Sequence, residues 1–310
     1  MKILVIIVTF NAMRWIERCF KSLETSSVVP DVFVVDNGST DGTQVYIKDN
    51  YPNTIFQQSH KNLGFGQANN LGLTYALENN YDFVYLLNQD AWIQPDTLEK
   101  LINLSNMHPE FGLISPVQMN ADLYHIDKNF FYGLCNYKNK DIINDLYNKQ
   151  LRNIYETTPF VMAAHWFLTR KCIEIVGGFS PTFKHYGEDN NYAERVLFHG
   201  FKIGVAPQLS VVHDRGERND SSRKVMYLNY IGLLITISSP NKGRKILDAL
   251  VRNVYNIFKY KSFLPIYYLL QLPFKSCKLV KNRRSSMKDN GAFLNTVSAS
   301  QKEKYNTTQG

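Results

Sequence analysis

Cysteine is scarce in this sequence, and its 310 residues contain only four. They are far apart and form no CxxC pair: Cys19, Cys135, Cys172 and Cys277. Scattered cysteines argue against a disulfide framework and against a cysteine-based zinc site, and they favour a reducing compartment.

Long apolar runs are also missing. The longest stretch without charge, residues 225–241, has 17 residues and includes several polar side chains. It falls short of the roughly 20 apolar residues that a membrane-spanning helix needs. Residues 1–8 are apolar but lack a basic n-region and a small-residue cleavage site. We therefore interpret them as a first strand and not as a signal peptide.

Charge is unevenly distributed in an otherwise ordinary composition of 44% hydrophobic and 20% charged residues. The net charge of +8 comes from residues 242–304, which carry 14 Lys/Arg and 3 Asp/Glu, whereas the rest carries 21 Lys/Arg and 24 Asp/Glu. This separation indicates an anionic partner for the C-terminal part.

Strand-like and helix-like patterns alternate through the first 120 residues. Strands are predicted at 2–8, 32–35, 54–57, 84–87 and 112–115, with helices at 12–24, at 67–78 and after Asp96. This order predicts an α/β fold with a mostly parallel, Rossmann-like central sheet and helices on both faces.

The pattern changes after residue 120. We expect an irregular insertion over 120–158, a strand within 159–169 and a helix that ends at Gly177. A helix over 188–198 and two short strands, 202–206 and 209–213, separated by Pro207, complete this region. Residues 283–310 are polar and are predicted to be disordered.

Residues 225–282 alternate apolar, aromatic stretches with basic ones. Two interpretations are open. They form either a helical subdomain packed on the core or helices that lie in a membrane interface. The combination of aromatic and basic residues favours association with an anionic membrane surface.

Polar side chains follow three of the predicted strands: Thr9 and Asn11, then Asp36, then Asn88 and Asp90. Because the carboxyl ends of parallel strands meet at one edge, these side chains can contact one ligand. A carboxylate there suits Mg²⁺ or Mn²⁺ carrying a diphosphate. Asp36 could also accept from the ring N3–H of uracil or thymine, or simply bind its own turn.

The segment 62–69 contains two closely spaced glycines but reads GxGxxN. It is not the dinucleotide fingerprint, so a nicotinamide or flavin site is not expected. Its glycines could still let backbone N–H groups approach an anion at a helix start.

Two further segments carry chemistry. Glu188 and Asp189 begin a predicted helix, where the dipole stabilises them and where one could act as a general base. His213 ends an apolar strand just before a polar turn, which leaves its imidazole available to a metal or a phosphate.

The ordered set of motifs resembles glycosyltransferase family 2 over residues 2 to about 215. The motifs are Val8-Thr9-Phe10-Asn11, the run 34–42, the run 62–66, Leu86-Leu87-Asn88-Gln89-Asp90, the run 176–179 and Gly187-Glu188-Asp189. The resemblance implies a GT-A fold, a nucleotide-diphosphate-sugar donor, a divalent metal (Mn²⁺ or Mg²⁺) and inversion at the anomeric carbon.

It also implies roles. Asp189 would be the catalytic base beside Glu188, and Asp90 and His213 would bind the metal. The donor would contact Thr9, Asn11, Asp36, Asn37, Asn62, Gly64 and Asn88, with Arg215 or Arg218 as phosphate clamps. One departure is Asn88, which stands where the family's DxD motif has its first Asp. A neutral amide binds a divalent cation more weakly, and this setting resembles bacterial rhamnosyltransferase-like members.

With the composition of the C-terminal part, the resemblance divides the chain into an expected catalytic domain, 1–224, the extension 225–282 and the tail 283–310. Residues 1–115 would bind the nucleotide, and 116–224 would carry the acceptor and catalytic side. We expect transfer from dTDP-rhamnose or a UDP-sugar to a hydroxyl of a growing cell-surface glycan or lipid-linked oligosaccharide. The enzyme would lie at the cytoplasmic face of the cell membrane.

Three alternatives remain at this point. The protein could bind nucleotide sugars with weak or no transfer, or it could be a nucleotidyltransferase, although the Glu-Asp element far downstream suits sugar transfer better. It could also use its basic tail on nucleic acid. The sequence has no helix-turn-helix, zinc-finger or RNP signature, so we expect no nucleic-acid partner.

Overall fold

A computed structural model of the chain describes residues 1–134, 140–157, 161–215, 221–241 and 246–294. Its strands are β1 (Ile3–Thr9), β2 (Asp31–Asp36), β3 (Ile55–Gln58), β4 (Phe83–Asn88), β5 (Ala91–Trp92), β6 (Phe111–Met119), β7 (Tyr155–Glu156), β8 (His165–Thr169) and β9 (Lys202–His213). Within the described residues these strands form one sheet, in the order β3-β2-β1-β4-β8-β6-β9-β5, with β7 paired to β9.

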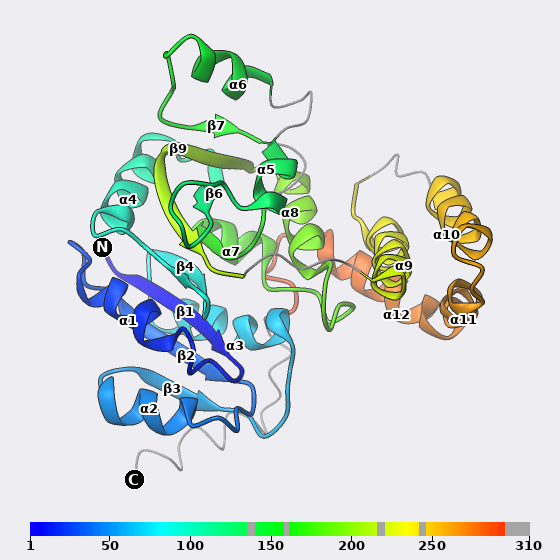
Figure 1. Cartoon of the computed structure of the whole chain (residues 1–310), viewed down its shortest axis with the longest axis horizontal. Helices are drawn as coiled ribbons and strands as arrows, with labels where there is room; N and C mark the ends of the chain where they lie inside the picture. The colour runs from blue at the N-terminus through cyan, green and yellow to red at the C-terminus, as the bar shows by residue number, and fades with distance from the viewer. Residues whose placement is uncertain (135–139, 158–160, 216–220, 242–245, 295–310) are drawn as a thin grey trace.

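The longest ladders of this sheet are parallel. Strand β1 lies between β2 and β4, β2 pairs with β3, and β6 pairs with β9, all in parallel. The predicted mostly parallel sheet is thus confirmed. Figure 1 shows β3, β2, β1 and β4 side by side. Strand β8 inserts antiparallel between β4 and β6, so the sheet is mixed on that side.

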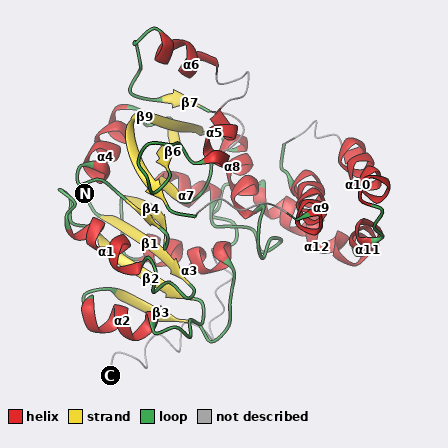
Figure 2. Ribbon diagram, viewed as in Figure 1, coloured by secondary structure: helices red, strands yellow, loops and turns green. Residues whose placement is uncertain are grey.

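Helices cover both faces of the sheet, as Figure 2 shows. They are α1 (Ile16–Glu24), α2 (Thr43–Asn50), α3 (Phe65–Glu78), α4 (Thr97–Met107), α7 (Arg170–Val176) and α8 (Glu188–Phe198). The core on one face joins Leu4 and Ile6 of β1 to α3, α7 and α8. The core on the other face joins Val5 and Ile7 of β1 to α1, α2 and α4. Burial on both faces explains why β1 reads as an unbroken apolar run.

The predicted break at Pro207 is wrong, because β9 runs through it as one strand. On the partner strand β6 the register jumps between Pro116 and Val117, which pair with Ala206 and Ser210. The residues between Ala206 and Ser210 form a bulge, the setting in which a sheet tolerates proline. The predicted strand within 159–169 begins only at His165, and residues 158–160 lie outside the described ones.

The predicted irregular insertion is also wrong. It contains α5 (Lys128–Leu134), α6 (Lys140–Tyr147) and β7. Phe130, Leu134 and Ile142 from these helices are buried in the core on the α3 face. These helices were not predicted because few apolar residues mark their period among many Asn, Lys and Tyr residues. Tertiary packing, and not a local pattern, stabilises them.

The C-terminal part is helical, with α9 (Ser222–Ser238), α10 (Ile246–Tyr260), α11 (Leu264–Leu270) and α12 (Leu272–Ser286). These four helices form a unit beside the sheet (Figure 1), joined to the segment before α8 by a small core of Phe183, Tyr230, Ile231, Leu234 and Leu279. Among the described helices, none combines the length and apolar character that a membrane crossing requires.

The predicted disordered tail is wrong for residues 283–294. Helix α12 extends to Ser286, and Ala292, Phe293 and Leu294 are buried. The guanidinium of Arg195 lies 4.8 Å from the Phe293 ring centroid, and the Gly178 backbone N–H donates to the Ala292 carbonyl at 2.8 Å. This segment therefore packs against α8 and the end of α7. Residues 295–310 lie outside the described part.

Candidate active site

The structure brings three strand ends together at the carboxyl edge of the parallel ladders. Thr9 at the end of β1 is in register with Asp36 at the end of β2, and Val8 is in register with Asn88 at the end of β4. Open α/β sheets bind ligands at this edge. The turn that follows β4 carries Asp90, so it extends the same edge toward β9.

Asp36 is a buried carboxylate surrounded by donors. It accepts from the Thr9 hydroxyl at 2.8 Å, the Ser39 backbone N–H at 2.9 Å and the Gln58 amide at 2.8 Å, with further contacts from Gly38 and Gln44. Burial alone raises the pKa of Asp36, but these hydrogen bonds outweigh it and hold the pKa below its usual value. Thr9 and Asp36 have no exposed surface, so they form the floor of the edge.

Three of the four predicted asparagines fix the loops above that floor. The Asn11 side-chain oxygen accepts from the Thr40 N–H at 2.8 Å, and that of Asn37 accepts from the Leu63 N–H at 3.2 Å. Asn62 accepts from the Gly64 N–H at 2.8 Å. Asn11 and Asn62 are exposed, whereas Asn37 is buried. The loops after β1, β2 and β3 are thus tied into one surface.

Gly64 has a packing role that the sequence did not indicate. Its φ is +79°, and a β-carbon there would lie 2.1 Å from the backbone oxygen of Lys184. Its own N–H already bonds to Asn62, so it is not free to bind an anion as expected. The missing side chain instead lets the segment that precedes Glu188 pack against the start of α3.

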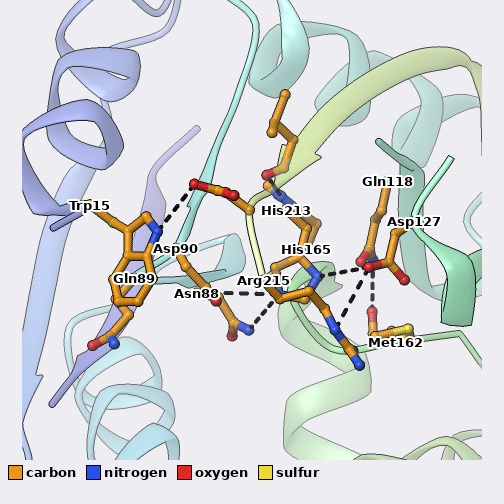
Figure 3. A network of polar contacts seen from close by, with 12 residues as sticks. Trp15, Asn88, Gln89, Asp90, Gln118, Asp127, Met162, His165, His213 and Arg215 are labelled. Atoms are coloured by element: carbon orange, nitrogen blue, oxygen red, sulfur yellow. Dashed lines mark hydrogen bonds and ion pairs between the residues drawn. The ribbon is translucent and has the colours of Figure 1, made fainter. Parts of the chain in front are cut away.

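The metal candidates lie on neighbouring elements (Figure 3). Ala91 of β5 pairs with His213 of β9, which brings the His213 Nε2 atom to 3.6 Å from Asp90 Oδ1 and 3.5 Å from Asn88 Nδ2. Arg215 follows, with its Nε atom 3.9 Å from Asp127 Oδ2. Arg218 lies outside the described residues.

Asp90 and His213 fit part of a coordination shell. Ligand atoms at about 2.1 Å from an octahedral ion lie roughly 3 Å apart, close to their 3.6 Å separation. The described residues contain no cluster of three or more His, Cys, Asp or Glu that could hold a metal alone. The donor set therefore suits an ion that takes its remaining ligands from phosphate oxygens and water.

Glu188 and Asp189 occupy the first turn of α8. Glu188 is buried, and its Oε2 atom has no hydrogen-bond partner among the described residues. Burial, and then the Asp189 charge, raise the pKa of Glu188 to about 7. Burial also raises the pKa of Asp189, whose Oδ1 accepts from the Asn190 N–H at 2.8 Å. Such a pair can hold and release a proton near neutral pH.

Sequence reasoning missed three residues of this region. Asp127, in the insertion, lies beside His213 and Arg215. Trp15 donates its indole N–H to Asp214 at 3.2 Å. Gln89 accepts from the Phe10 N–H at 2.7 Å and joins the first and fourth strand ends. Asp127 follows no predicted strand and lies in a segment predicted to be irregular, so no sequence signal marked it.

A mixed α/β sheet with acidic strand ends, and with a carboxylate pair on a later helix, is the arrangement expected of the GT-A fold. The chain belongs to glycosyl transferase family 2, which it matches over residues 4–175. The family and the fold expected from the motifs are both confirmed.

Its curated relatives include bacterial rhamnosyltransferases. The chain is 29% identical over 240 residues to the N-acetylglucosaminyl-diphospho-decaprenol L-rhamnosyltransferase of Mycobacterium tuberculosis, covering 68% of this chain and 75% of that protein. It is 22% identical over 181 residues to the dTDP-rhamnosyl transferase RfbF of Shigella flexneri, covering 58% of this chain and only 56% of the relative.

Solved structures share the fold. TarS residues 1–349 of S. aureus, in complex with UDP, align with a TM-score of 0.57 at 15% identity, covering 100% of this chain and 92% of that one. The mannosyltransferase PcManGT of Pyrobaculum calidifontis, in complex with GDP-Man and Mn²⁺, aligns with a TM-score of 0.55 at 15% identity, covering 99% and 79%.

Proposed function

We propose that this protein transfers a sugar, from dTDP-rhamnose or a UDP-sugar, to a hydroxyl of a growing cell-surface glycan or lipid-linked oligosaccharide. The observation that carries the proposal is the convergence of Asp36, Asn88 and Asp90 at one sheet edge, beside His213. Relatives named as rhamnosyltransferases support the choice of donor.

In this proposal Asp189 is the general base. The acceptor hydroxyl gives its proton to Asp189 as its oxygen bonds to the anomeric carbon, and the bond from that carbon to the diphosphate oxygen breaks. Glu188 stands beside it, and the Asp189 charge helps to raise the pKa of Glu188. Inversion follows because attack and departure occur on opposite faces of the sugar.

The site must also stabilise the negative charge of the leaving diphosphate. Asp90 and His213 would hold a divalent ion there, and such an ion supplies Lewis-acid stabilisation of the charge that develops on the leaving group. Arg215 would add a charge-assisted hydrogen bond to a phosphate oxygen. Asn88 would contact the donor and leave most of the metal binding to its neighbours.

The remaining strand-end residues would receive the nucleoside. Asn11 and Asn62 are exposed and can contact it directly, whereas Thr9, Asn37 and Gly64 shape the surface beneath. Asp36 would bind a uracil or thymine N3–H in place of the amide of Gln44 or Gln58, two side chains that donate to its Oδ2 atom.

We also propose that the C-terminal unit docks on an anionic membrane surface, at the cytoplasmic face where lipid-linked acceptors would be available. Helix α10 supports this because it buries polar residues and exposes apolar ones. Its buried face carries Asn253 and Asn256, and Asn253 donates to the Asn229 carbonyl of α9. Its outer face carries exposed apolar residues: Leu247, Val251, Val254, Tyr255 and Phe258.

The neighbouring helices carry further exposed apolar residues, with basic residues near them in the sequence. Phe263, Leu270 and Phe274 are exposed on or beside α11 and α12. Basic residues flank them in the sequence: Arg252, Lys259, Lys261, Lys275 and Lys278. Exposed aromatics beside basic residues match an anionic interface, where each basic residue contributes about 1 kcal/mol.

A donor screen tests the proposed reaction. Thermal unfolding is measured with dTDP-rhamnose, UDP-sugars and GDP-sugars, with and without Mn²⁺. We expect a dTDP- or UDP-sugar to raise the unfolding midpoint, and to raise it further with Mn²⁺. No shift with any nucleotide sugar would contradict the proposal. A shift without transfer or donor hydrolysis would instead favour a nucleotide-sugar-binding protein.

A further inference from the structure

Asp127 is a buried carboxylate that faces two residues of the site. Its Oδ2 atom lies 3.9 Å from Nδ1 of His213 and 3.9 Å from Nε of Arg215 (Figure 3). We propose that Asp127 is the positioning residue for both side chains, which aims the imidazole at Asp90 and the guanidinium at the donor diphosphate. This inference rests on the proposed function, since it takes His213 and Arg215 as residues that serve the metal and the diphosphate.

The two oxygens of Asp127 have separate contacts. Oδ1 accepts from the backbone N–H groups of Asn129 and Phe130, at 2.9 and 3.0 Å, where α5 begins. The Asp127 backbone N–H donates to the Gln118 carbonyl at the end of β6, at 2.8 Å. The carboxylate is therefore held in one orientation, with Oδ2 directed at the site.

His213 needs such a partner. Its Nδ1 atom is buried and has no hydrogen-bond partner among the described residues, and an unmade hydrogen bond of a buried polar group is costly. Asp127 Oδ2 is the carboxylate that faces it. A small side-chain rotation or one bridging water would complete the contact from 3.9 Å.

This contact would also select the useful tautomer. A histidine that binds a metal through one ring nitrogen commonly donates its other N–H to a carboxylate, which fixes the ring orientation. With the proton on Nδ1 toward Asp127, the lone pair of Nε2 points toward Asp90, 3.6 Å away. The same carboxylate thus orders the imidazole for a cation.

Arg215 is held by the same turn of α5. The side-chain oxygen of Asn129, oriented to accept, lies 2.9 Å from Nη1 of Arg215. Asp127 faces the Nε side of the same guanidinium. Two residues of the insertion therefore fix the direction of this cation, which connects the insertion to the diphosphate end of the site.

The competing explanation is that Asp127 only caps α5, and two substitutions separate these roles. Asp127→Asn keeps an oxygen for the helix start, because Asn and Asp are comparable N-caps, but it removes the negative charge that faces His213 and Arg215. Asp127→Ala removes both. The matched control is Asp122→Asn in the same insertion, since Asp122 also accepts from a turn (Tyr124 and His125 N–H) and contacts the His125 ring at 2.7 Å on the exposed surface.

The measurement is an electron paramagnetic resonance titration of Mn²⁺ on the full chain, with saturating dTDP or UDP, together with the midpoint of thermal unfolding. We expect Asp127→Asn to weaken Mn²⁺ binding 10- to 100-fold with an unchanged unfolding midpoint. Asp127→Ala should weaken binding and also lower the midpoint, while Asp122→Asn should bind Mn²⁺ as the wild type does.

Equal Mn²⁺ affinities of the wild type and Asp127→Asn would overturn this inference alone, and a loss of midpoint only in Asp127→Ala would then assign Asp127 to capping. If the wild type binds no Mn²⁺ with dTDP, UDP or GDP, the metal-assisted form of the proposed function is overturned as well. The two failures are therefore distinguishable.

Discussion

Gly187 packs directly on Ile231, because a β-carbon at position 187 would lie 2.6 Å from the Ile231 Cγ2 atom of α9. Gly187 has a φ of +88°, and Tyr186 before it has a φ of +67°. Two successive left-handed residues thus make a turn immediately before Glu188, and α9 closes over that turn. The C-terminal helical unit therefore positions the carboxylate pair.

Gly187→Ala should lower both stability and turnover. The left-handed conformation costs an L-residue roughly 1–2 kcal/mol, and the new methyl group must displace Ile231 or the turn. We expect a lower unfolding midpoint and a fall in kcat of at least about 10-fold, since small displacements of catalytic groups are costly. Gly200→Ala is the control: its φ is +80° but nothing lies within 4 Å of a β-carbon there. Equal kcat values in both variants would contradict a positioning role for the turn.

Asp189→Asn tests the general base. The amide keeps the size of the side chain but cannot accept a proton, so we expect kcat to fall about 10²–10⁴-fold. Donor binding, measured by calorimetry, should stay within about twofold because the strand-end residues are untouched. Near-normal turnover in this variant would remove Asp189 from the role.

The general base should give the reaction an acid limb above the pH range of an ordinary aspartate. Burial raises the pKa of Asp189. Since a base must be ionised, kcat/KM should rise with pH through a midpoint higher than that of an exposed carboxyl. Glu188→Gln removes the neighbouring carboxyl, whose own pKa burial and the Asp189 charge raise to about 7, and a limb due to Asp189 should remain in this variant. Loss of the limb in Glu188→Gln would assign it to Glu188.

The raised pKa of Glu188 also makes the stability of the fold depend on pH. A carboxyl whose pKa is higher in the folded state binds its proton more tightly there than in the unfolded chain. The stabilisation is present at low pH and is lost as pH rises from the ordinary 4.5 through about 7. Glu188→Gln should flatten this dependence, and urea unfolding at pH 5 and pH 8 measures it.

Asp90→Ala should weaken metal-dependent donor binding more than donor binding without metal. Asp90 Oδ1 and His213 Nε2 lie 3.6 Å apart, so either loss leaves a single protein ligand. We expect the additional thermal shift that Mn²⁺ gives with a nucleotide sugar to disappear in Asp90→Ala and to shrink in His213→Ala. A full Mn²⁺-dependent shift in Asp90→Ala would refute the ligand assignment.

The outer face of α10 should determine membrane binding. The triple variant Leu247→Ser, Val251→Ser, Phe258→Ser removes exposed side chains without touching Asn253 or Asn256 of the buried face. We expect at least about a 10-fold loss of sedimentation with anionic vesicles at low salt, since burying such side chains contributes 1.5–3 kcal/mol each at most.

The control for this experiment exchanges apolar residues on a distant, equally exposed surface. Val29→Ser with Val45→Ser fits, because these side chains are 86% and 63% exposed on the sheet domain. This double variant should sediment like the wild type. If the α10 variant instead changes only the oligomeric state in analytical ultracentrifugation, the apolar face is an interface between copies of the chain.

The local sequence pattern was enough to predict those helices and strands whose own residues mark where they begin, end and are buried. The apolar run of β1, the polar ends of β1, β2 and β4, and the helix after Gly187 could be predicted because strand burial and helix starts leave local marks. The ordered motifs then gave the family. The α5 and α6 helices left weak marks, since their stability comes from a few side chains such as Phe130 buried far away in sequence.

The amino-acid sequence by itself determined which residues end the parallel strands, and hence the class of chemistry at that edge. Only the tertiary structure decided that β9 crosses Pro207 to bring His213 beside Asp90, that Asp127 faces both His213 and Arg215, and that α9 closes on Gly187. The physical reason is distance along the chain: these contacts join segments tens of residues apart, and their geometry depends on sheet register and helix packing, which local periodicity does not encode.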